Sequence, residues 1–410
     1  MRSRIITSST IPHRLLTPDT RRLVVVTGFI AGHSVLPNVL CHVGWLIFGA
    51  LFCLRGLRLP PMASFAPVSL FLGWMALRSL FSSGAESAFG ILSTALLVLF
   101  LILLCHLHHS LDRCGRWNGH LSALAALVSL GWHFHRYGVN FVDYRLENLL
   151  VYGGLNAVCT GLIFGFAAMW LCVLRITRWT AASALVLTTA AFCSGSRGTM
   201  LALLTAHAVL LLMHGWRKGW KPQVVLVTAF ALYSMTGLLT PAPAKSTASA
   251  VAVARPVRKA LARSYEGRFS IYHAGWSSLD TPWRHVIGIG QWGTRARWQQ
   301  RLDPSFMELK GHLHSAFFAT YVHGGLTGAA LLLLVMIRLT RRAVSCACEG
   351  DARWPALLAF GITALLFDGE SLAHLLTLPR FETLLFWLPA TMLLAQASES
   401  SQTVSCPPSA

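Results

Sequence analysis

The amino-acid sequence predicts an all-α polytopic membrane protein with about twelve transmembrane helices of roughly 20 residues each. Three observations support this fold class. Hydrophobic residues make up 54% of the 410 residues and charged residues only 12%, whereas a soluble domain has about 25% charged residues. Apolar runs recur along most of the chain. The short segments between alternate runs are rich in Lys and Arg, as cytoplasmic loops of membrane proteins are.

The apolar runs set the order of the expected spans. Pro37 separates the first two runs, and "RGLRLPP" ends the second. No small-residue cleavage site follows the first run, so we expect an uncleaved first span with the N-terminus inside. The expected spans are residues 23–36, 39–55, 64–80, 88–107, 120–136, 153–174, 179–194, 198–214, 221–240, 314–337, 355–373 and 381–397.

The charge pattern orients these spans. The expected inner connections "HHSLDRCGRWNGH", "LRITRW" and "RLTRRAVSCACEGDAR" are basic, whereas the outer connection "GHSVLPN" contains no Lys, Arg, Asp or Glu. Both termini are therefore expected in the cytoplasm. The chain divides into an N-terminal bundle of about nine spans (1–240), an outer loop (241–313), about three C-terminal spans (314–397) and a cytoplasmic tail (398–410).

The outer loop is basic, although the charge pattern places it outside. Over the whole chain, 34 Lys and Arg compare with 15 Asp and Glu, a formal net charge of +19. Cytoplasmic loops explain much of this excess, so the charge does not require a nucleic-acid partner. The basic outer loop has no such explanation, and it indicates a polyanionic partner outside the membrane.

Part of the outer loop has a helical period. Aromatic and apolar residues recur at helical spacing, and basic residues lie opposite them. This pattern predicts an amphipathic helix at the outer interface, with its aromatic rings against lipid headgroups. A helix that only caps the bundle is the alternative. The first set is Leu261, Tyr265, Phe269, Tyr272 and Trp276, and the second is Arg258, Lys259 and Arg263.

Three short stretches contain candidate functional residues. Arg197 lies in the outer turn "CSGSRGTM", where small residues leave open backbone for an anion, although an arginine near a membrane end can simply snorkel. Arg268 lies on the expected interfacial helix, upstream of "GIGQWG". That Gly-x-Gly follows no strand, which excludes a dinucleotide-binding interpretation.

Histidines occupy the start of the span at 314–337. His312 and His314 precede the apolar run, and His323 lies inside it. An imidazole can exchange protons near neutral pH, although a histidine held by structural hydrogen bonds is the simpler interpretation of each one alone. Asp368 and Glu370, in "FDGESLAH", are acids that could orient such a histidine or be ordinary loop acids.

The sequence contains no metal-binding signature. The ten cysteines form no CxxC pair, and we find no HExxH, no P-loop and no DxD pair in the outer loops. We therefore expect no metal and no cofactor.

Together these motifs resemble the O-antigen ligase and polymerase superfamily of bacterial envelope glycosyltransferases. The resemblance covers roughly Val151 to Val335 and the overall span pattern. His312 does not fit the family spacing, which selects His314. Ser315 stands where family members often have Asn, and His323 where an acid often precedes the Gly-Leu pair. The matching motifs are Ser196-Arg197-Gly198, Gly267-Arg268 with Tyr272, Gly288-Ile289-Gly290, and His314-Ser315 with Gly325-Leu326-Thr327-Gly328.

The resemblance implies a GT-C-like membrane protein with interfacial helices in a large periplasmic loop. It implies transfer of O-antigen from undecaprenyl pyrophosphate to lipid A–core, at the periplasmic face of the bacterial inner membrane. Membrane lipids would be further partners. Arg197 and Arg268 would bind the pyrophosphate, and His314 would be the general base. Supporting candidates are His312, Arg145 near Asn156, Asp368 and Tyr272.

Other functions stay open at this point. An O-antigen polymerase or a protein O-oligosaccharyltransferase would carry the same motifs, although the modest length and the basic outer loop favour a ligase. A transporter of lipid-linked glycans should have ionisable residues deep within its spans, and Arg78, His207 and Asp368 leave room for one. A structural scaffold is the remaining alternative.

Overall fold

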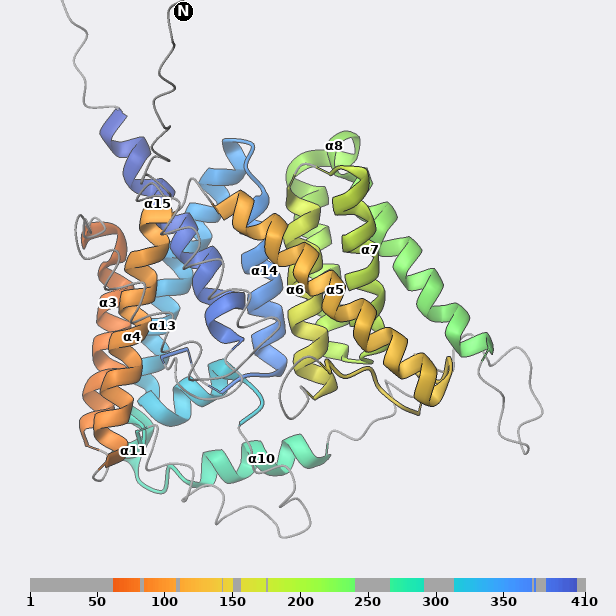
Figure 1. Cartoon of the computed structure of the whole chain (residues 1–410). Helices are drawn as coiled ribbons and strands as arrows, with labels where there is room; N and C mark the ends of the chain where they lie inside the picture. Colours follow the sequence, from red (N-terminus) through yellow and green to blue (C-terminus); the bar gives the residue numbers. More distant parts are fainter. Residues whose placement is uncertain are drawn as a thin grey trace, which may run out of the picture.

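The computed structural model describes residues 62–81, 85–107, 111–141, 143–149, 156–174, 176–239, 266–290, 313–370, 372–373 and 381–403. Every regular element within these residues is a helix (Figure 1). The helices are α3 (Met62–Leu80), α4 (Ala85–Leu107), α5 (Leu111–Tyr137), α6 (Ala157–Val173), α7 (Arg178–Cys193), α8 (Arg197–Leu239), α10 (Glu266–Ser277), α11 (Pro282–Ile287), α13 (Ala316–Cys348), α14 (Arg353–Phe367), the π-helix η4 (Thr383–Trp387) and α15 (Leu388–Thr403).

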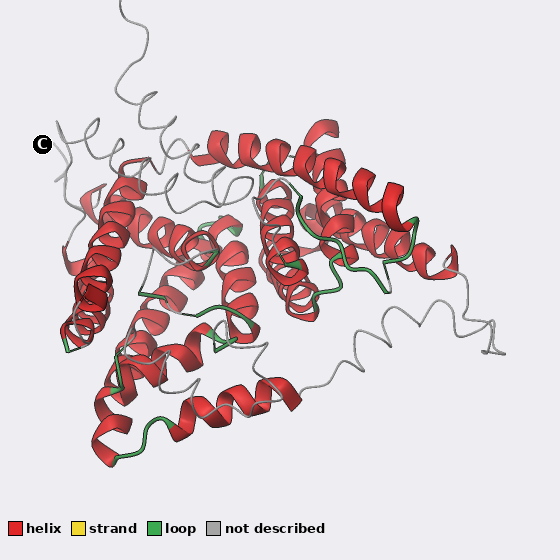
Figure 2. Cartoon of the chain, turned by 60° about the horizontal axis from the view of Figure 1, so that its bottom comes forward, coloured by secondary structure: helices red, strands yellow, loops and turns green. Residues whose placement is uncertain are grey.

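The helices form two packed groups that α14 joins. One group contains α5, α6, α7 and α8, and the other contains α3, α4, α13 and α15. The joining helix packs on α6 and α8 on one side and on α13 and α15 on the other. In Figures 1 and 2, α10 lies across one end of the bundle, where it contacts α13.

Helix α6 is the centre of the first group. Almost every residue of α6 is buried, as expected for a helix that is apolar on all sides. Its start is fixed by Asn156, whose side chain accepts hydrogen bonds from the backbone nitrogens of Val158 and Cys159, both at 3.0 Å. Helix α7 starts with a capping box between Thr177 and Thr180. These caps fix where each helix begins.

Several helices differ in length from the expected spans. Helix α5 begins at Leu111, because the segment before the predicted span 120–136 contains no proline and its glycines, Gly115 and Gly119, pack directly on Trp170 and Leu171 of α6. The element α8 covers both predicted spans 198–214 and 221–240, which are two helices joined at Gly215, where the backbone (φ +64°, ψ 170°) is not helical. Helix α13 continues to Cys348, well beyond residue 337.

The predicted span 355–373 is too long at its C-terminal end. Helix α14 ends at Phe367, because Asp368 has extended backbone and Gly369 has a φ of +99°. The carboxyl end of α14 is therefore an irregular loop. This loop brings Asp368 to the start of α13, where the backbone nitrogen of Ala316 donates to the carbonyl of Asp368 at 3.3 Å.

Two of the described helices are long and apolar enough to cross a membrane. They are Arg197–Gly215, the first part of α8, and Ala316–Cys348, which is α13. Shorter apolar helices accompany them. An all-helical chain with such spans fits a helical membrane protein. The predicted spans 23–36 and 39–55 lie outside the described residues, and the total of about twelve stays a prediction.

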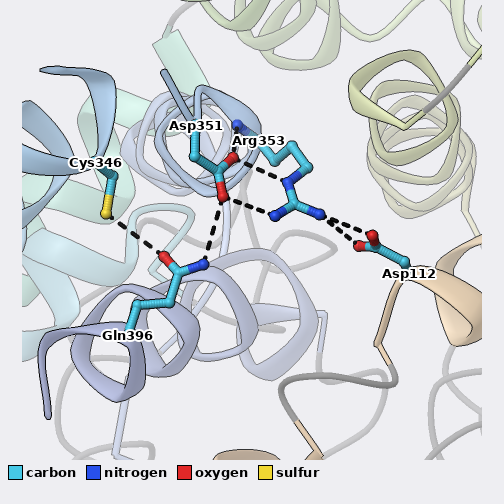
Figure 3. Close-up of polar contacts among 5 residues, drawn as sticks. All are labelled: Asp112, Cys346, Asp351, Arg353 and Gln396. Carbon is cyan, nitrogen blue, oxygen red and sulfur yellow. Dashed lines mark hydrogen bonds and ion pairs between the residues drawn. The ribbon is translucent and has the colours of Figure 1, made fainter. Parts of the chain in front are cut away.

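A polar network ties four helices together at the start of α14 (Figure 3). Arg353 binds the carboxylate of Asp112, from α5, at 2.8 and 2.9 Å, and also binds Asp351 at 2.8 Å. Gln396 of α15 donates to Asp351 at 3.4 Å and accepts from the thiol of Cys346 at 3.5 Å. The network thus links both helix groups at the end of α14 opposite Asp368.

Candidate functional site

The turn between α7 and α8 positions Arg197 at the first residue of α8. Gly195 has a φ of +61°, and the Ser196 hydroxyl accepts a hydrogen bond from the backbone of the first helical turn at 3.3 Å. The turn packs closely on Gly161 of α6, where any side chain would collide with Ser194. The sequence "SGSRG" therefore makes a capped helix N-terminus, which favours anions nearby.

Arg145 lies beside the same turn. Its Nε donates to the carbonyl of Ser194 at 2.6 Å, and the backbone nitrogen of Leu146 donates to the carbonyl of Cys193 at 3.1 Å. The segment after α5 is thus fixed to the C-terminal end of α7. Asn156, which we expect near Arg145, caps the start of α6 with its side chain.

A cavity of about 390 Å³ brings the candidate residues together. Arg145, Arg197 and Arg268 line it with Asp368, although these four residues come from separate parts of the chain. Guanidinium groups keep their charge and bind phosphate oxygens in pairs, so this arrangement suits a polyphosphate ligand. The remaining lining residues are Gly195, Ser196, Gly198 and the apolar set Val158, Leu162, Met200, Leu201, Leu204, Ala364 and Phe367.

His314 lies next to this cavity through its contact with Asp368. The Nδ1 atom of His314 is 3.5 Å from Oδ1 of Asp368, whose side chain is almost fully buried. The imidazole keeps 21% of its surface exposed. A carboxylate at Nδ1 favours the tautomer that has its proton there, which leaves Nε2 as the basic nitrogen.

The backbone of His314 is also unusual. Its φ of +51° is the only positive value at a non-glycine residue in the described part of the chain. Such a conformation costs about 1–3 kcal/mol and is found most often at functional sites. Tyr272 helps to hold it, because the Tyr272 hydroxyl donates to the carbonyl of His314 at 3.3 Å.

Tyr272 is a suitable donor for this bond. Burial raises the pKa of Tyr272, Arg268 lowers it and Asp368 raises it, with a net increase. The phenol therefore stays protonated at neutral pH. Its ring packs edge-on against Phe318, with 5.1 Å between ring centroids. Because Arg268 and Tyr272 are four residues apart on α10, the same helix face reaches both the cavity and His314.

Helix α10 is held in place by a small apolar cluster. Ile271 and Ala274 are buried against Leu313, Ala319 and Val322. A helix therefore runs from Glu266 to Ser277, and its buried side faces α13. Its amphipathic character and its place at a membrane interface stay predictions. Phe269 is largely exposed and Tyr272 is half-buried, so only part of the predicted aromatic stripe faces outward. The upstream members of both predicted sets lie outside the described residues.

The two glycine motifs pack directly against each other. Gly288 and Gly325 have φ values of +73° and +67°, and a side chain at either one would collide with backbone across the contact. The backbone nitrogen of Gly290 donates to the carbonyl of His323 at 3.0 Å. His323 is buried at this crossing. These glycines therefore fix α11 on α13.

One residue near the site was missed from the sequence. Glu382 is 97% buried, and its carboxylate accepts a hydrogen bond from the backbone nitrogen of Glu370 at 2.8 Å. It therefore shapes the loop that carries Asp368. An acid at the start of an otherwise apolar run was the signal that could have identified it. His312 lies outside the described residues.

No group of three or more His, Cys, Asp or Glu side chains with metal-binding geometry occurs in the described ranges. The absence of a metal requirement stays a prediction, and the cations available at this cavity are the guanidinium groups.

Comparison with known families agrees with the position of this site. The family model described as O-antigen ligase matches residues 182–333. The matched segment includes Arg197, Arg268, Tyr272 and His314 and both glycine motifs, whereas Arg145 and Asp368 lie outside it. No curated protein matches the chain.

Proposed function

We propose that this chain, whose residues 182–333 match the O-antigen ligase family model, transfers O-antigen polysaccharide from undecaprenyl pyrophosphate to a sugar hydroxyl of lipid A–core. The reaction would take place at the periplasmic face of the bacterial inner membrane. The observation that carries the proposal is one cavity lined by Arg145, Arg197 and Arg268, with the Asp368–His314 pair beside it.

The arginines would neutralise the leaving group. As the bond between the anomeric carbon and the phosphate oxygen breaks, negative charge grows on the diphosphate. Arg197 and Arg268 would bind its oxygens, and Arg145 would add a third positive charge. One well-placed donor at developing charge contributes about 3 kcal/mol, or about a hundredfold in rate.

His314 would activate the acceptor. Its Nε2 would take the proton of the sugar hydroxyl while the acceptor oxygen forms the new bond to the anomeric carbon. Asp368 would stabilise the imidazolium that results, and Tyr272 would hold the backbone in position. General base catalysis of this kind contributes roughly 10²–10⁴-fold. Direct displacement inverts the anomeric configuration, and undecaprenyl pyrophosphate leaves.

The apolar side of the cavity is consistent with a lipid-linked donor. Leu201, Leu204 and Phe367 line the cavity and remain 44%, 54% and 37% exposed. An isoprenoid chain could lie against these side chains while its diphosphate reaches the arginines. The donor would then stay in the bilayer during the reaction.

The test is glycan transfer by the purified protein with a chelator present. The donor is lipid-linked O-antigen, and the acceptors are lipid A–core, a second lipid-linked glycan and an acceptor protein, each supplied separately and together. We expect Arg268→Ala and His314→Ala to lower transfer to lipid A–core by at least about a hundredfold. Arg136→Ala, which removes an exposed arginine at the end of α5, is the matched control.

Each alternative outcome has a defined meaning. Product only on the second lipid-linked glycan would indicate a polymerase, and product only on an added acceptor protein would indicate a protein O-oligosaccharyltransferase. Loss of transfer on adding chelator would contradict the metal-free mechanism. Donor movement across proteoliposomes that persists in both variants would favour a transporter.

A further inference from the structure

A second hollow lies where α10 is followed by α11, away from the arginine cavity. Its volume is about 500 Å³. Trp276 and Leu279 supply apolar surface, and Ser277, Asp280 and His285 supply polar groups. The hollow therefore combines a large aromatic ring with several hydrogen-bonding side chains, and the function proposed above uses none of these residues.

The indole ring of Trp276 is held in a fixed orientation. It stacks on Tyr321 of α13, with ring centroids 5.7 Å apart and 29° between the planes. His285 lies 5.0 Å from the indole and shares a hydrogen bond of 2.8 Å between its Nδ1 and the Tyr321 hydroxyl. Nevertheless, 54% of Trp276 stays exposed. A rigid aromatic ring with an open surface binds ligands at little entropic cost.

The charges around this ring do not favour an anion. Asp280 forms an ion pair with Arg284, so the carboxylate and the guanidinium compensate each other. Hydroxyl and imidazole groups make up the other polar atoms. This combination suits a neutral ligand with many hydroxyl groups, because such a ligand can donate to the carboxylate and also exchange hydrogen bonds with the other groups.

The hollow lies along the same face of α10 as the arginine cavity. Arg268, Tyr272 and Trp276 are spaced four residues apart, so they form one row on that helix. Arg268 lines the cavity, Tyr272 binds the backbone of His314, and Trp276 lines the hollow. The two ends of this row are about 12 Å apart along the helix axis. A short oligosaccharide can cover that distance.

We propose that the hollow at the α10–α11 junction binds a sugar ring of one of the two glycan substrates, several sugars away from the reacting bond. This inference rests on the proposed function. The apolar C–H face of a pyranose ring would lie on Trp276, and its hydroxyls would bind Asp280, Ser277 and His285. The hollow would select the glycan and hold it while its reacting end meets His314.

The test measures binding and transfer separately in the full-length purified protein. The binding probes are core oligosaccharide freed from lipid A and O-antigen glycan freed from its carrier, each titrated by saturation-transfer NMR. We expect wild-type protein to bind one probe, and the probe that binds identifies the source of the sugar. Trp276→Leu should weaken this binding at least about tenfold, whereas Trp276→Phe should keep most of it. Trp283→Leu, which removes a 65% exposed tryptophan outside the hollow, is the control.

In the transfer assay, Trp276→Leu should raise KM for the same substrate about tenfold and leave kcat within about threefold. Equal losses in Trp276→Leu and Trp283→Leu would show that both tryptophans only anchor the loop to lipid, and would overturn the proposal. Unchanged binding and KM in Trp276→Leu would overturn it as well. Free glycan binds without reacting, so the binding assay does not depend on transfer activity. If the protein binds glycan in a manner that depends on Trp276 but transfers none, the proposed function is refuted and the hollow is still a glycan-binding site.

Discussion

Replacing Asp368 by Asn removes the charge beside His314 and preserves the shape of the loop. The Oδ1 atom of Asp368 accepts a hydrogen bond from the backbone nitrogen of Gly369 at 2.9 Å, and an amide oxygen can accept the same bond. The main change is therefore the loss of the negative charge 3.5 Å from Nδ1 of His314.

The size of the effect follows from that distance. An imidazolium and a carboxylate separated by 3.5 Å attract each other by about 5 kcal/mol at an effective dielectric constant of about 20. The amide dipole of Asn keeps part of this attraction, so we expect a loss of about 3 kcal/mol from the transition state, or about a hundredfold in kcat. The KM for lipid-linked donor should rise by less than about threefold, because Asp368 contributes no positive charge to donor binding.

The assay is steady-state glycan transfer at saturating acceptor, with Glu370→Gln as the matched control. This control removes a carboxylate two residues away in the same loop. We expect it to keep nearly full activity, since Asp368 forms the ion pair with the imidazole. A kcat within about threefold of wild type in Asp368→Asn, or an equal loss in Glu370→Gln, would refute the orienting role of Asp368.

Three further predictions concern the frame around the site. Gly288→Ala should destabilise the protein by about 3 kcal/mol or more, because a side chain would collide with an α13 carbonyl. The measurement is thermal unfolding followed by size-exclusion chromatography, with Gly73→Ala as the control, because a methyl group at Gly73 meets open space. Equal melting temperatures for wild type, Gly288→Ala and Gly73→Ala would contradict this prediction. Burial raises the pKa of Asp351, but hydrogen bonds from Arg353 outweigh it and lower the pKa. The stability that comes from a lowered pKa is present above the unfolded pKa of about 3.9 and is lost as the pH falls through the folded pKa. Asp351→Asn should therefore have a lower melting temperature at pH 7, and its melting temperature should change less than that of wild type as the pH is lowered. Parallel plots of melting temperature against pH for the two proteins would contradict this prediction. Arg145→Lys should raise KM for the donor about tenfold. Lysine cannot replace the hydrogen bond from Nε of Arg145 to the carbonyl of Ser194 and also bind phosphate with two donors. An unchanged KM would show that Arg145 does not bind the donor.

Local patterns in the sequence predicted much of this architecture. Apolar runs identified α3 to α8 and α13 to α15, since burial in a helical membrane protein requires long apolar segments. The helical period of the outer loop predicted α10, whereas α11 was not predicted. The motifs around Arg197, Arg268 and His314 predicted one shared site, and the structure places the two arginines in one cavity with His314 beside it. Their assignment to catalysis and donor binding stays a prediction.

Other features depend on contacts between distant segments, which local patterns do not encode. The bond from Arg145 to Ser194 joins residues 49 positions apart, and the pair of Arg353 with Asp112 joins residues 241 positions apart. Nothing in either segment alone predicts its partner. Helix ends were misjudged for a related reason. Hydropathy detects where apolar residues stop, whereas α5 and α13 continue through polar segments. In α5, close packing of Gly115 and Gly119 on α6 accompanies this extension.

The crossing of Gly288 and Gly325 has a mechanical consequence. Most helix contacts are made by side chains, which can adjust to a neighbouring substitution by rotating about their χ angles. This contact is backbone against backbone, so it has no rotatable groups to absorb a displacement. Any movement of α11 must therefore be transmitted to the first turns of α13 as a rigid shift. A sugar seated against α11 would in this way adjust the spacing at the imidazole, without any change in the residues that surround it.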